Sequence, residues 1–518
     1  MSEDLQFYST LLNILVFLPL AGIPLILLLK SSMAKYLALG TSVVVLVLTG
    51  VLYTGYLQFS GPEIAADGFV FQSSAEWFSA RYDIKFITGI DGITIYLVLL
   101  NAILFPLAIL FSMGSVTKNE KGYYNLLLLL MTGVTGVFVS LDLVLFYVFF
   151  ELGLIPMYFL IGIWGGKNRI YASVKFFLYT LVGSLLMMVA ILYLGFAAGP
   201  AFDAVFTSDY LKIIAGIDVP GGVQNYLFWG FALSFLIKVP VFPVHTWLPD
   251  AHVQAPTSGS VILAGILLKM GTYGLIRFCL PLFPEASIEA APCMALLGVI
   301  GITYGAMAAM VQTDIKKLVA YSSVAHMGFI VLGIFAMTEE AMAGSVIQMI
   351  NHGISTGGLF LLVGMIYDRR HSREISDFKG IAKQLPVFTL LFMITTMSSI
   401  GLPGLNGFVG EFLILIGSFG SPAIGSPVYT IIATTGVIIA AVYMLWMFRR
   451  VMFGQLDKEE NKNLKDLNTR EVGIMLPLIL LMFLLGFYAT PFLEEISLSS
   501  DIIVSRTLEA MNEAVALR

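Results

Sequence analysis

Long apolar stretches, separated by short polar segments, follow one another along almost the whole chain. A helix needs about 20 apolar residues to cross the roughly 30 Å hydrocarbon core of a bilayer. By this criterion the pattern predicts about fourteen transmembrane helices, and the fold class is an all-α polytopic membrane protein. The crossings are expected near residues 9–29, 36–58, 92–113, 122–140, 142–164, 171–196, 226–247, 257–277, 291–312, 318–337, 342–366, 386–419, 428–448 and 472–491.

Prolines interrupt two of these crossings in similar contexts. Pro240 follows Ile-Lys-Val in the seventh crossing, and Pro403 follows Ile-Gly-Leu in the twelfth. Proline lacks a backbone N–H and clashes with the preceding turn, so we expect helices 7 and 12 to be broken. The two run in opposite directions in this topology, which is typical of an inverted repeat with an ion site at its interface.

Two segments outside the crossings have patterns of their own. Residues 59–90 include GFVFQSSAEWF and RYDIKFITG, whose alternation and aromatic residues predict a short β-hairpin. Residues 493–518 predict an amphipathic surface helix with Ser499 and Ser500 as candidate N-caps and a frayed tail as the alternative. Its apolar face is expected to be Val504, Leu508, Met511 and Val515.

The basic residues are distributed unevenly between the two ends of the predicted helices. Positively charged residues collect in the cytoplasmic loops of membrane proteins. Most of the 28 lysines and arginines fall in alternate connecting segments, at 30–35, 118–121, 167–175, 316–317, 369–383 and 449–470. The opposite segments carry only Arg81, Lys85, Lys212, Arg277, Arg506 and Arg518. This asymmetry predicts that both termini are extracytoplasmic, in a bacterial plasma membrane.

Composition and motifs argue against several classes of function. Hydrophobic residues are 58% and charged residues 12% of the chain, against about a quarter charged in soluble domains. The net charge of −5 is not gathered into a basic arm or an acidic tail, so no nucleic-acid partner is expected. The two cysteines, Cys279 and Cys293, form no Cys-x-x-Cys motif, and no nucleotide-binding glycine motif is present. We therefore expect no metal and no cofactor in this chain.

Lysines occur at positions where the bilayer should be. Lys238 and Lys269 each lie in an apolar run, and the segment between them contains Pro240, Pro243, Pro249 and Pro256. An ionisable group at membrane depth is costly unless it faces a protein interior or a wet cavity, so its default interpretation is functional. For Lys269 the alternative is that the ammonium reaches the interface along its aliphatic stem. The same segment contains candidates for proton entry, with loop packing as their alternative: His245, Asp250 and His252.

Further ionisable residues extend this series. Glu151 lies in VLFYVFFELGLIPMYFL, and Lys238 is its expected partner; a buried pair that only fixes helix packing is the alternative. His326 and His352 lie in later crossings, where a neutral imidazole passes a proton between waters or is a satisfied packing residue. Glu411 follows the break in helix 12 and is expected to be an uncompensated carboxylate that exchanges protons with the outer side. The predicted proton relay is Glu151, Lys238, Lys269, His326, His352 and Glu411.

Four motifs resemble one known family. They read F-E-L-x-L-I-P at Phe150–Pro156, I-K-x-P-x-x-P-x-H-x-W-L-P-D-A-H at Ile237–His252, L-L-K-M-G-x-Y-G at Leu267–Gly274 and G-L-P-G-L-N-G-F-x-G-E-F at Gly401–Phe412. They occur in this order over most of the chain, and the long second motif is hard to obtain by chance. In these residues the chain is similar to the antiporter-like membrane subunits shared by respiratory complex I and the multi-subunit cation/proton antiporters.

The resemblance implies an architecture. Residues 1–121 would hold the first three helices and an outer loop, residues 122–277 and 291–448 two inverted five-helix units, and residues 472–518 the last crossing and a C-terminal helix. It also implies a function, as a proton-translocating membrane subunit of an NADH:quinone oxidoreductase in which Glu151 tunes the proton affinity of Lys238. Flavin, iron–sulfur clusters and quinone would lie in partner subunits, and the neighbours would be other antiporter-like subunits and lipid. Glu411 favours the middle large subunit, because related subunits usually carry lysine there.

Two alternatives remain open at this point. A subunit of a multi-subunit sodium/proton antiporter would share nearly every motif, although the acidic Glu411 argues mildly against it. A stand-alone secondary transporter for a small solute would also have broken helices. Such a transporter needs a pocket with convergent polar groups, whereas the polar residues here form a line along the chain.

Overall fold

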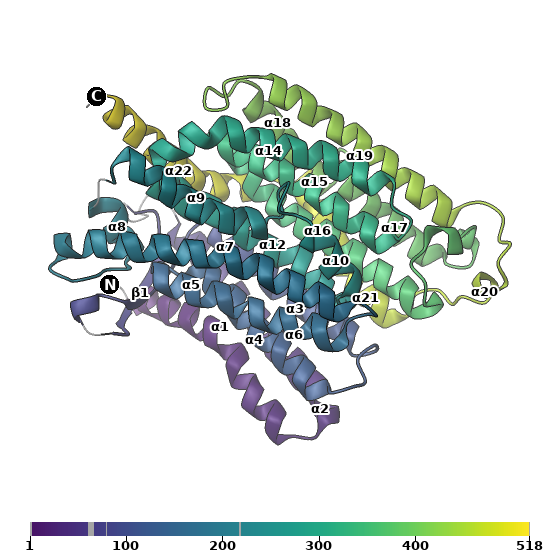
Figure 1. Ribbon diagram of the computed structural model, residues 1–518. Coiled ribbons are helices and arrows are strands. Elements are labelled where there is room, and N and C mark those ends of the chain that lie inside the picture. The colour runs from purple at the N-terminus through teal and green to yellow at the C-terminus, as the bar shows by residue number, and fades with distance from the viewer. Residues whose placement is uncertain (1–2, 61–66, 79, 217–218, 517–518) are drawn as a thin grey trace.

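A computed structural model describes residues 3–60, 67–78, 80–216 and 219–516 of the 518-residue chain. The chain is folded almost entirely into helices (Figure 1). Its first half consists of α1 (Glu3–Leu28), α2 (Ser31–Phe59), β1 (Val70–Glu76), η1 (Ala80–Tyr82), β2 (Lys85–Ile90), α3 (Thr94–Ser112), α4 (Glu120–Val139), α5 (Leu143–Leu152), α6 (Leu154–Trp164), α7 (Arg169–Ala198), η2 (Gly199–Phe202), α8 (Tyr210–Gly216), α9 (Gly221–Lys238) and α10 (Trp247–Gln254). The second half consists of α11 (Thr257–Ile262), η3 (Leu263–Leu267), α12 (Leu268–Gly274), η4 (Leu275–Cys279), α13 (Leu280–Leu282), α14 (Pro284–Met310), α15 (Ile315–Ala336), α16 (Glu339–Arg370), η5 (Ile375–Asp377), η6 (Ile381–Lys383), α17 (Pro386–Ser399), α18 (Asn406–Phe419), α19 (Val428–Met452), α20 (Glu459–Lys462), α21 (Thr469–Phe487) and α22 (Thr490–Ala516).

The helices confirm the predicted polytopic membrane fold. Within the described part of the chain, 12 helical stretches are long and apolar enough to cross a membrane. The predicted crossings that are missing from this set are the seventh and the twelfth, which both consist of shorter pieces. Residues 239–246 separate α9 from α10, and residues 400–405 separate α17 from α18. Both interruptions contain the prolines that predict them.

The eighth crossing is less regular than its apolar pattern predicts. It runs from Thr257 to Leu282 as α11, η3, α12, η4 and α13, and both η3 and η4 are π-helical turns. A π turn shifts the register of the side chains that follow it and is frequent at functional sites. The residues of η3, Leu-Ala-Gly-Ile-Leu, are compatible with an ordinary α-helix, so the sequence pattern contains no indication of the turn.

The core of the molecule is formed by α15, α16 and the eighth crossing. In the most apolar stretch of α16 and of the eighth crossing all residues are buried, and in that of α15 94% are buried. In the corresponding stretch of α2 only 28% of the residues are buried. α16 packs against both α15 and α18. Because buried polar side chains need partners, the polar residues of these central helices mark where a functional site should lie.

The predicted β-hairpin is present at the end of the molecule where α1 begins and α22 ends (Figure 1). β1 and β2 pair in antiparallel fashion. Asp83, between the strands, forms ion pairs with Lys85 at 2.8 Å and with Lys212 of α8 at 2.7 Å. Burial opposes ionisation of Asp83, but the hydrogen bonds from Lys212 and Lys85 outweigh it and lower the pKa of this carboxyl to about 2. Asp83 therefore attaches the hairpin to α8.

The predicted C-terminal helix is confirmed, but its predicted start is wrong. α22 begins at Thr490, so Ser499 and Ser500 lie in its interior and are not N-caps. Pro491, in the first turn, has a backbone angle that is already suited to a helix start. Ser499 instead accepts a hydrogen bond from the backbone N–H of Gly92 at 2.8 Å, which docks α22 near the start of α3. Of the predicted apolar face, Val504 is buried and Leu508 half-buried, and the side chains of Met511 and Val515 lie outside the described residues.

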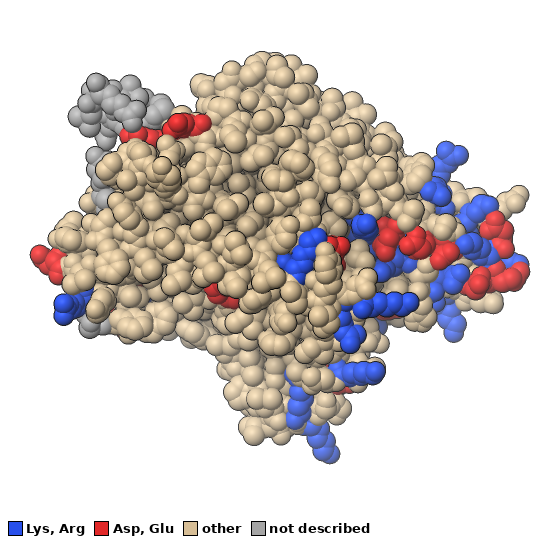
Figure 2. Space-filling view, in the orientation of Figure 1, with Lys and Arg blue, Asp and Glu red and all other residues tan. Residues whose placement is uncertain are grey.

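Lysine and arginine side chains gather at the opposite end of the molecule, around α20 (Figure 2). Two basic residues that the sequence pattern assigns to connecting segments are instead buried. Arg277 lies in η4 and forms an ion pair with the buried Asp91, which directly follows β2 of the hairpin. Lys316 lies near the start of α15 and is only 5% exposed.

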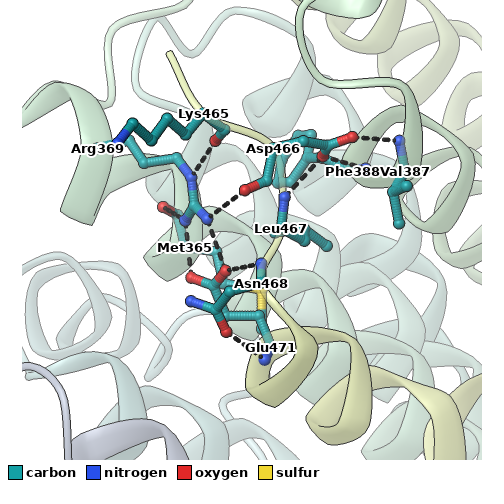
Figure 3. A network of polar contacts seen from close by, with 9 residues as sticks. All are labelled: Met365, Arg369, Val387, Phe388, Lys465, Asp466, Leu467, Asn468 and Glu471. Atoms are coloured by element: carbon teal, nitrogen blue, oxygen red, sulfur yellow. Dashed lines mark hydrogen bonds and ion pairs between the residues drawn. The ribbon is translucent and has the colours of Figure 1, made fainter.

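A network of polar contacts joins three helices at this basic end (Figure 3). Arg369, near the end of α16, makes two hydrogen bonds to the carboxylate of Glu471 in α21, at 2.7 and 2.6 Å. It also donates to the backbone carbonyls of Lys465 and Asp466. The carboxylate of Asp466 accepts from the backbone N–H groups of Val387 and Phe388, at 2.7 and 3.0 Å, and so caps the first turn of α17. The network therefore connects α16, α17 and α21.

Candidate proton-transfer site

Lys269 lies in α12, two residues after the end of the π turn η3. The side chain is fully buried. Its Nζ donates to the carbonyl of Ala264 at 2.6 Å and lies 2.6 Å from Nδ1 of His352. Ala264 belongs to η3, so the irregular turn supplies an acceptor and helps to aim the lysine at α16. The structure thus brings two of the predicted relay residues into direct contact.

Glu411 and His326 form a second contact in the same core. Nδ1 of His326 lies 2.7 Å from Oε1 of Glu411, and the same oxygen accepts from Nε2 of Gln348 at 3.1 Å. Glu411 is 4% exposed. The expectation of an uncompensated carboxylate is therefore wrong, because side chains of α15 and α16 both hydrogen-bond to it.

The histidine of the Lys269–His352 contact and the histidine of the His326–Glu411 contact lie close to each other. The ring centroids of His326 and His352 lie 5.7 Å apart. Nε2 of each histidine has no hydrogen-bond partner among the described residues. A cavity of about 10 Å³, roughly the size that one water molecule needs, adjoins both rings. Its lining is polar and includes Gln348, Asn351, Ser355, Thr356, Ser398 and Ser399.

The interruption of helix 12 helps to form this cavity. The hydroxyl of Ser398, at the end of α17, donates to Oδ1 of Asn406 at 2.5 Å and lies 2.6 Å from the hydroxyl of Ser355. The amide of Asn351 donates to the backbone carbonyl of Asn406 at 2.7 Å. Gly401 and Gly404 have φ angles of +76° and +90°, which L residues with a side chain rarely adopt. Two glycines thus allow the turn that carries α18 and Glu411 back against α16.

Glu151 and Lys238 lie apart from this series and are not in direct contact. No ion pair within 4.0 Å joins them among the described residues, although they interact electrostatically. Nζ of Lys238 is 4.8 Å from the ring centroid of Phe150 and 5.9 Å from that of Phe176, and it has no hydrogen-bond partner in the described part. The lysine is therefore buried against aromatic faces, which attract a cation. The predicted direct pair is replaced by a longer-range interaction.

The three candidates for proton entry occupy different environments. Asp250 is half-exposed and forms an ion pair with Lys175 at 2.7 Å. His245 and His252 are buried, and neither ring nitrogen of either residue has a partner among the described residues. The ring of His252 stacks on that of Phe360, with centroids 4.5 Å apart. The histidines are thus enclosed, and Asp250 reaches the surface.

The sequence analysis does not identify several polar residues of this core. Gln348 lies one helical turn before His352, so its place on the same face of α16 could have been read from the spacing. Ser355, three residues after His352, could have been read in the same way, whereas Ser398 lies on another helix and has no such pattern. Lys316 lies two residues after Asp314 and directly before Lys317, so the sequence alone suggests a pair of lysines at the surface.

Comparisons with known proteins agree with this architecture. The family described as NADH:quinone oxidoreductase/Mrp antiporter, TM, matches residues 140–425. The chain is 45% identical to the NADH-quinone oxidoreductase subunit M of Rhodobacter capsulatus, over 93% of each chain. It is 41% identical to the NADH-ubiquinone oxidoreductase chain 4 of Marchantia polymorpha, over 94% of this chain and 95% of that one.

Solved structures share the fold. A chain of respiratory complex I from Thermus thermophilus with bound NADH has a TM-score of 0.85 and 30% identity, over 96% of this chain and 99% of that one. A chain of the Mrp complex from Dietzia sp. has a TM-score of 0.80 and covers 96% of this chain and 100% of that one; at 18% identity this shows a common fold alone.

The broken helices and the buried Lys–His–Glu contacts define a polytopic subunit of antiporter-like design, and the chain belongs to the NADH:quinone oxidoreductase/Mrp antiporter family. Its similarity over nearly the full length is to the M subunits, called chain 4 in Marchantia. The resemblance carried by the four sequence motifs is thereby confirmed.

Proposed function

We propose that this chain is a proton-translocating membrane subunit of an NADH:quinone oxidoreductase in a bacterial plasma membrane. The observation that carries the proposal is the buried contact series of Lys269, His352, His326 and Glu411. Each of these side chain types can bind and release a proton, and an ionisable group at membrane depth is costly, so its default interpretation is functional. Redox chemistry takes place in partner subunits, which hold the flavin, iron–sulfur clusters and quinone, and the neighbours are other membrane subunits and lipid.

In this relay a proton passes from one ionisable side chain to the next. Protons enter from the basic end, where Asp250 reaches the surface and His245 and His252 lie deeper, and load Lys238 and Lys269. Nζ of Lys269 passes a proton to Nδ1 of His352. One water in the adjoining cavity then connects Nε2 of His352 with Nε2 of His326, and His326 delivers the proton to Glu411. Glu151 acts on Lys238 through its charge, so protonation of either group changes the proton affinity of the other.

The identity with the M subunits favours this function over a sodium/proton antiporter subunit. This chain is 18% identical to the chain of the Mrp complex and 45% identical to the subunit M of Rhodobacter capsulatus. Absorbance of the purified complex that contains this chain decides between them. Flavin and iron–sulfur bands support the oxidoreductase, and their absence from an intact, proton-moving complex contradicts it.

The relay itself is tested by replacing Lys269 in the assembled complex. Lys269→Met keeps the length of the side chain but cannot bind a proton, and Lys269→Arg keeps the charge but does not release one. We expect both variants to reduce proton pumping in reconstituted vesicles at least tenfold per assembled complex. Lys379→Met, which removes a half-exposed lysine at the basic end, is the control and should pump like the parent. Normal pumping by assembled Lys269→Met would remove the relay.

A further inference from the structure

Ser355 of α16 has a hydroxyl whose hydrogen-bond direction is set by its neighbours. It is 3% exposed and lines the cavity that adjoins both histidine rings. Its Oγ lies 2.6 Å from Oγ of Ser398, and Ser398 donates to Oδ1 of Asn406 at 2.5 Å. The single hydroxyl proton of Ser398 is therefore committed to Asn406, since an amide oxygen only accepts. Ser355 must then donate to Ser398, so its lone pairs are left for a donor in the cavity.

The amide of Asn406 is held in this orientation by α16. Its Nδ2 donates to the backbone carbonyl of Asn351 at 3.3 Å, and Nδ2 of Asn351 donates to the backbone carbonyl of Asn406 at 2.7 Å. A flipped Asn406 amide would place its oxygen against the carbonyl of Asn351, which has no proton to give. The break in helix 12 thus supplies a fixed acceptor, and the bonds from Ser355 through Ser398 to Asn406 run in one direction.

The two imidazoles present opposite hydrogen-bonding groups to the same cavity. Nδ1 of His326 lies 2.7 Å from Glu411, and an ionised carboxylate only accepts, so neutral His326 carries its proton on Nδ1 and has an acceptor at Nε2. Nδ1 of His352 lies 2.6 Å from Nζ of Lys269, and an ammonium only donates, so neutral His352 carries its proton on Nε2. The cavity therefore has a donor on His352 and an acceptor on His326.

One water satisfies these groups together. It accepts from Nε2 of His352, donates one proton to Nε2 of His326 and donates the other to Oγ of Ser355. About three hydrogen bonds are typical of a buried water, and the cavity of about 10 Å³ has room for one. We propose that Ser355 is a positioning residue that orients the relay water toward His326. In this role Ser355 serves the proposed proton relay, on which the proposal rests.

The passage of a proton balances without oxidation or reduction. Lys269 gives a proton to Nδ1 of His352, and Nε2 of His352 gives its proton to the water. The water gives a different proton to Nε2 of His326, and Nδ1 of His326 gives its proton to Glu411. One proton has moved from Lys269 to Glu411, and the water is regenerated. The O–H bond that points at Ser355 takes no part, so it keeps the water in place.

A purely structural role for Ser355 makes a different prediction. The hydroxyl contact between Ser355 and Ser398 also ties α16 to α17, and alanine at either position removes that tie equally. Only Ser355→Ala removes the acceptor from the cavity. In Ser398→Ala the hydroxyl of Ser355 can donate directly to Oδ1 of Asn406, 3.4 Å away, so its lone pairs stay available to the water.

The test measures proton pumping per assembled complex in reconstituted vesicles, in H2O and in D2O. We expect Ser355→Ala to pump about fivefold less than the parent, the effect of losing one hydrogen bond of ordinary strength. Its ratio of rates in H2O and D2O should also rise, because transfer through the water then limits pumping. Ser398→Ala should lose clearly less. Ser345→Ala is the matched control, since this buried α16 serine donates to Ala341 and is not among the described residues that line the cavity.

Equal losses in Ser355→Ala and Ser398→Ala, or an unchanged isotope ratio in Ser355→Ala, would assign the serine to helix packing and overturn the proposal. If Ser355→Ala does not assemble, Ser355→Cys decides, because sulfur accepts hydrogen bonds only weakly. Parent-like pumping by that variant also overturns the proposal.

The Lys269→Met variant separates the role of Ser355 from the relay itself. Loss of pumping in Lys269→Met with parent-like pumping in Ser355→Ala refutes the positioning residue alone. Normal pumping in Lys269→Met refutes the relay.

Discussion

At the scale of single residues, the partner of a buried ionisable group determines what the group can do. Glu411 shows this most clearly, because His326 and Gln348 both hydrogen-bond to its carboxylate. A proton that arrives at His326 meets an acceptor 2.7 Å away, so transfer needs no rearrangement of the helices. The same contacts would equally well hold a glutamate that only packs. The choice of replacement separates these two roles.

If Glu411 loads and releases a proton, Glu411→Gln should fail despite its nearly identical shape, because the amide cannot change charge. We expect pumping per assembled complex to fall at least tenfold. Glu411→Asp should retain part of the activity, because it titrates but lies one methylene farther from His326. Glu411→Lys also carries a side chain that can bind and release a proton, so we expect partial activity with altered coupling to the histidines.

A packing role predicts the reverse order, with Gln tolerated best and Lys worst. The measurement is proton pumping in reconstituted vesicles, with the exposed Glu374→Gln as the control for changed charge. Parent-like pumping by Glu411→Gln would exclude Glu411 as a proton carrier.

At the scale of elements, interruptions of helices position the site. The break between α17 and α18 places Asn406 and Glu411 against α16, and the π turn η3 places the carbonyl of Ala264 beside Lys269. Such interruptions are tolerated at membrane depth only where protein or a wet cavity surrounds them. The helix ends must then be held from outside the site. The contacts of Arg369, Glu471 and Asp466 do this for α17 at the basic end (Figure 3).

Removing the side chain of Arg369 should loosen α17 without touching the relay. Arg369→Ala deletes the two-point ion pair with Glu471 and the bonds that hold the backbone at Lys465 and Asp466. The cap that Asp466 provides should weaken by about 1 kcal/mol or more. We expect hydrogen exchange at the backbone amides of Val387 and Phe388 to accelerate roughly tenfold, as measured by mass spectrometry on the complex.

Arg370→Ala is the matched control for this measurement. Arg370 is the next residue; it pairs at 3.6 Å with the largely exposed Glu460 and donates to Asn461 at 3.1 Å, but no contact joins it to Asp466 or Glu471 among the described residues. Unchanged exchange at Val387 and Phe388 in Arg369→Ala would show that the cap of α17 does not depend on the arginine.

At the scale of the whole molecule, charge is separated between two ends. Basic side chains gather around α20, while α1 begins and α22 ends at the other end (Figures 1 and 2). The burial of Arg277 and Lys316 removes one basic residue from each side, so the asymmetry remains. Since such residues stay in the cytoplasm, we propose that the end with the hairpin faces outward.

Labelling with a membrane-impermeant thiol reagent in intact cells tests this orientation. Because the native Cys293 is exposed, the parent for the experiment is Cys293→Ser. Ser74→Cys in the hairpin and Ser505→Cys in α22 are at exposed positions and should label. Gln455→Cys, exposed at the basic end, should label only after the cells are opened. Labelling of Gln455→Cys alone in intact cells would reverse the topology.

The sequence by itself determined the membrane class, the positions of the crossings, the two broken helices and the hairpin. These features follow from local properties: the length of an apolar run, the missing N–H of proline and the alternation of a strand. Local reasoning also singled out Lys269, His326, His352 and Glu411, because the cost of burying an ionisable group can be read from its neighbours in the chain.

Only the tertiary structure decided which of these groups touch. Lys269 meets His352 across 83 positions of the chain, and His326 meets Glu411 across 85, so no local pattern contains either contact. For the same reason the structure replaced the direct Glu151–Lys238 pair by aromatic contacts around the lysine. It also moved Lys316 from an apparent surface pair into the core. The energy of a charge inside a protein depends on the atoms that surround it, and packing of distant helices supplies those atoms.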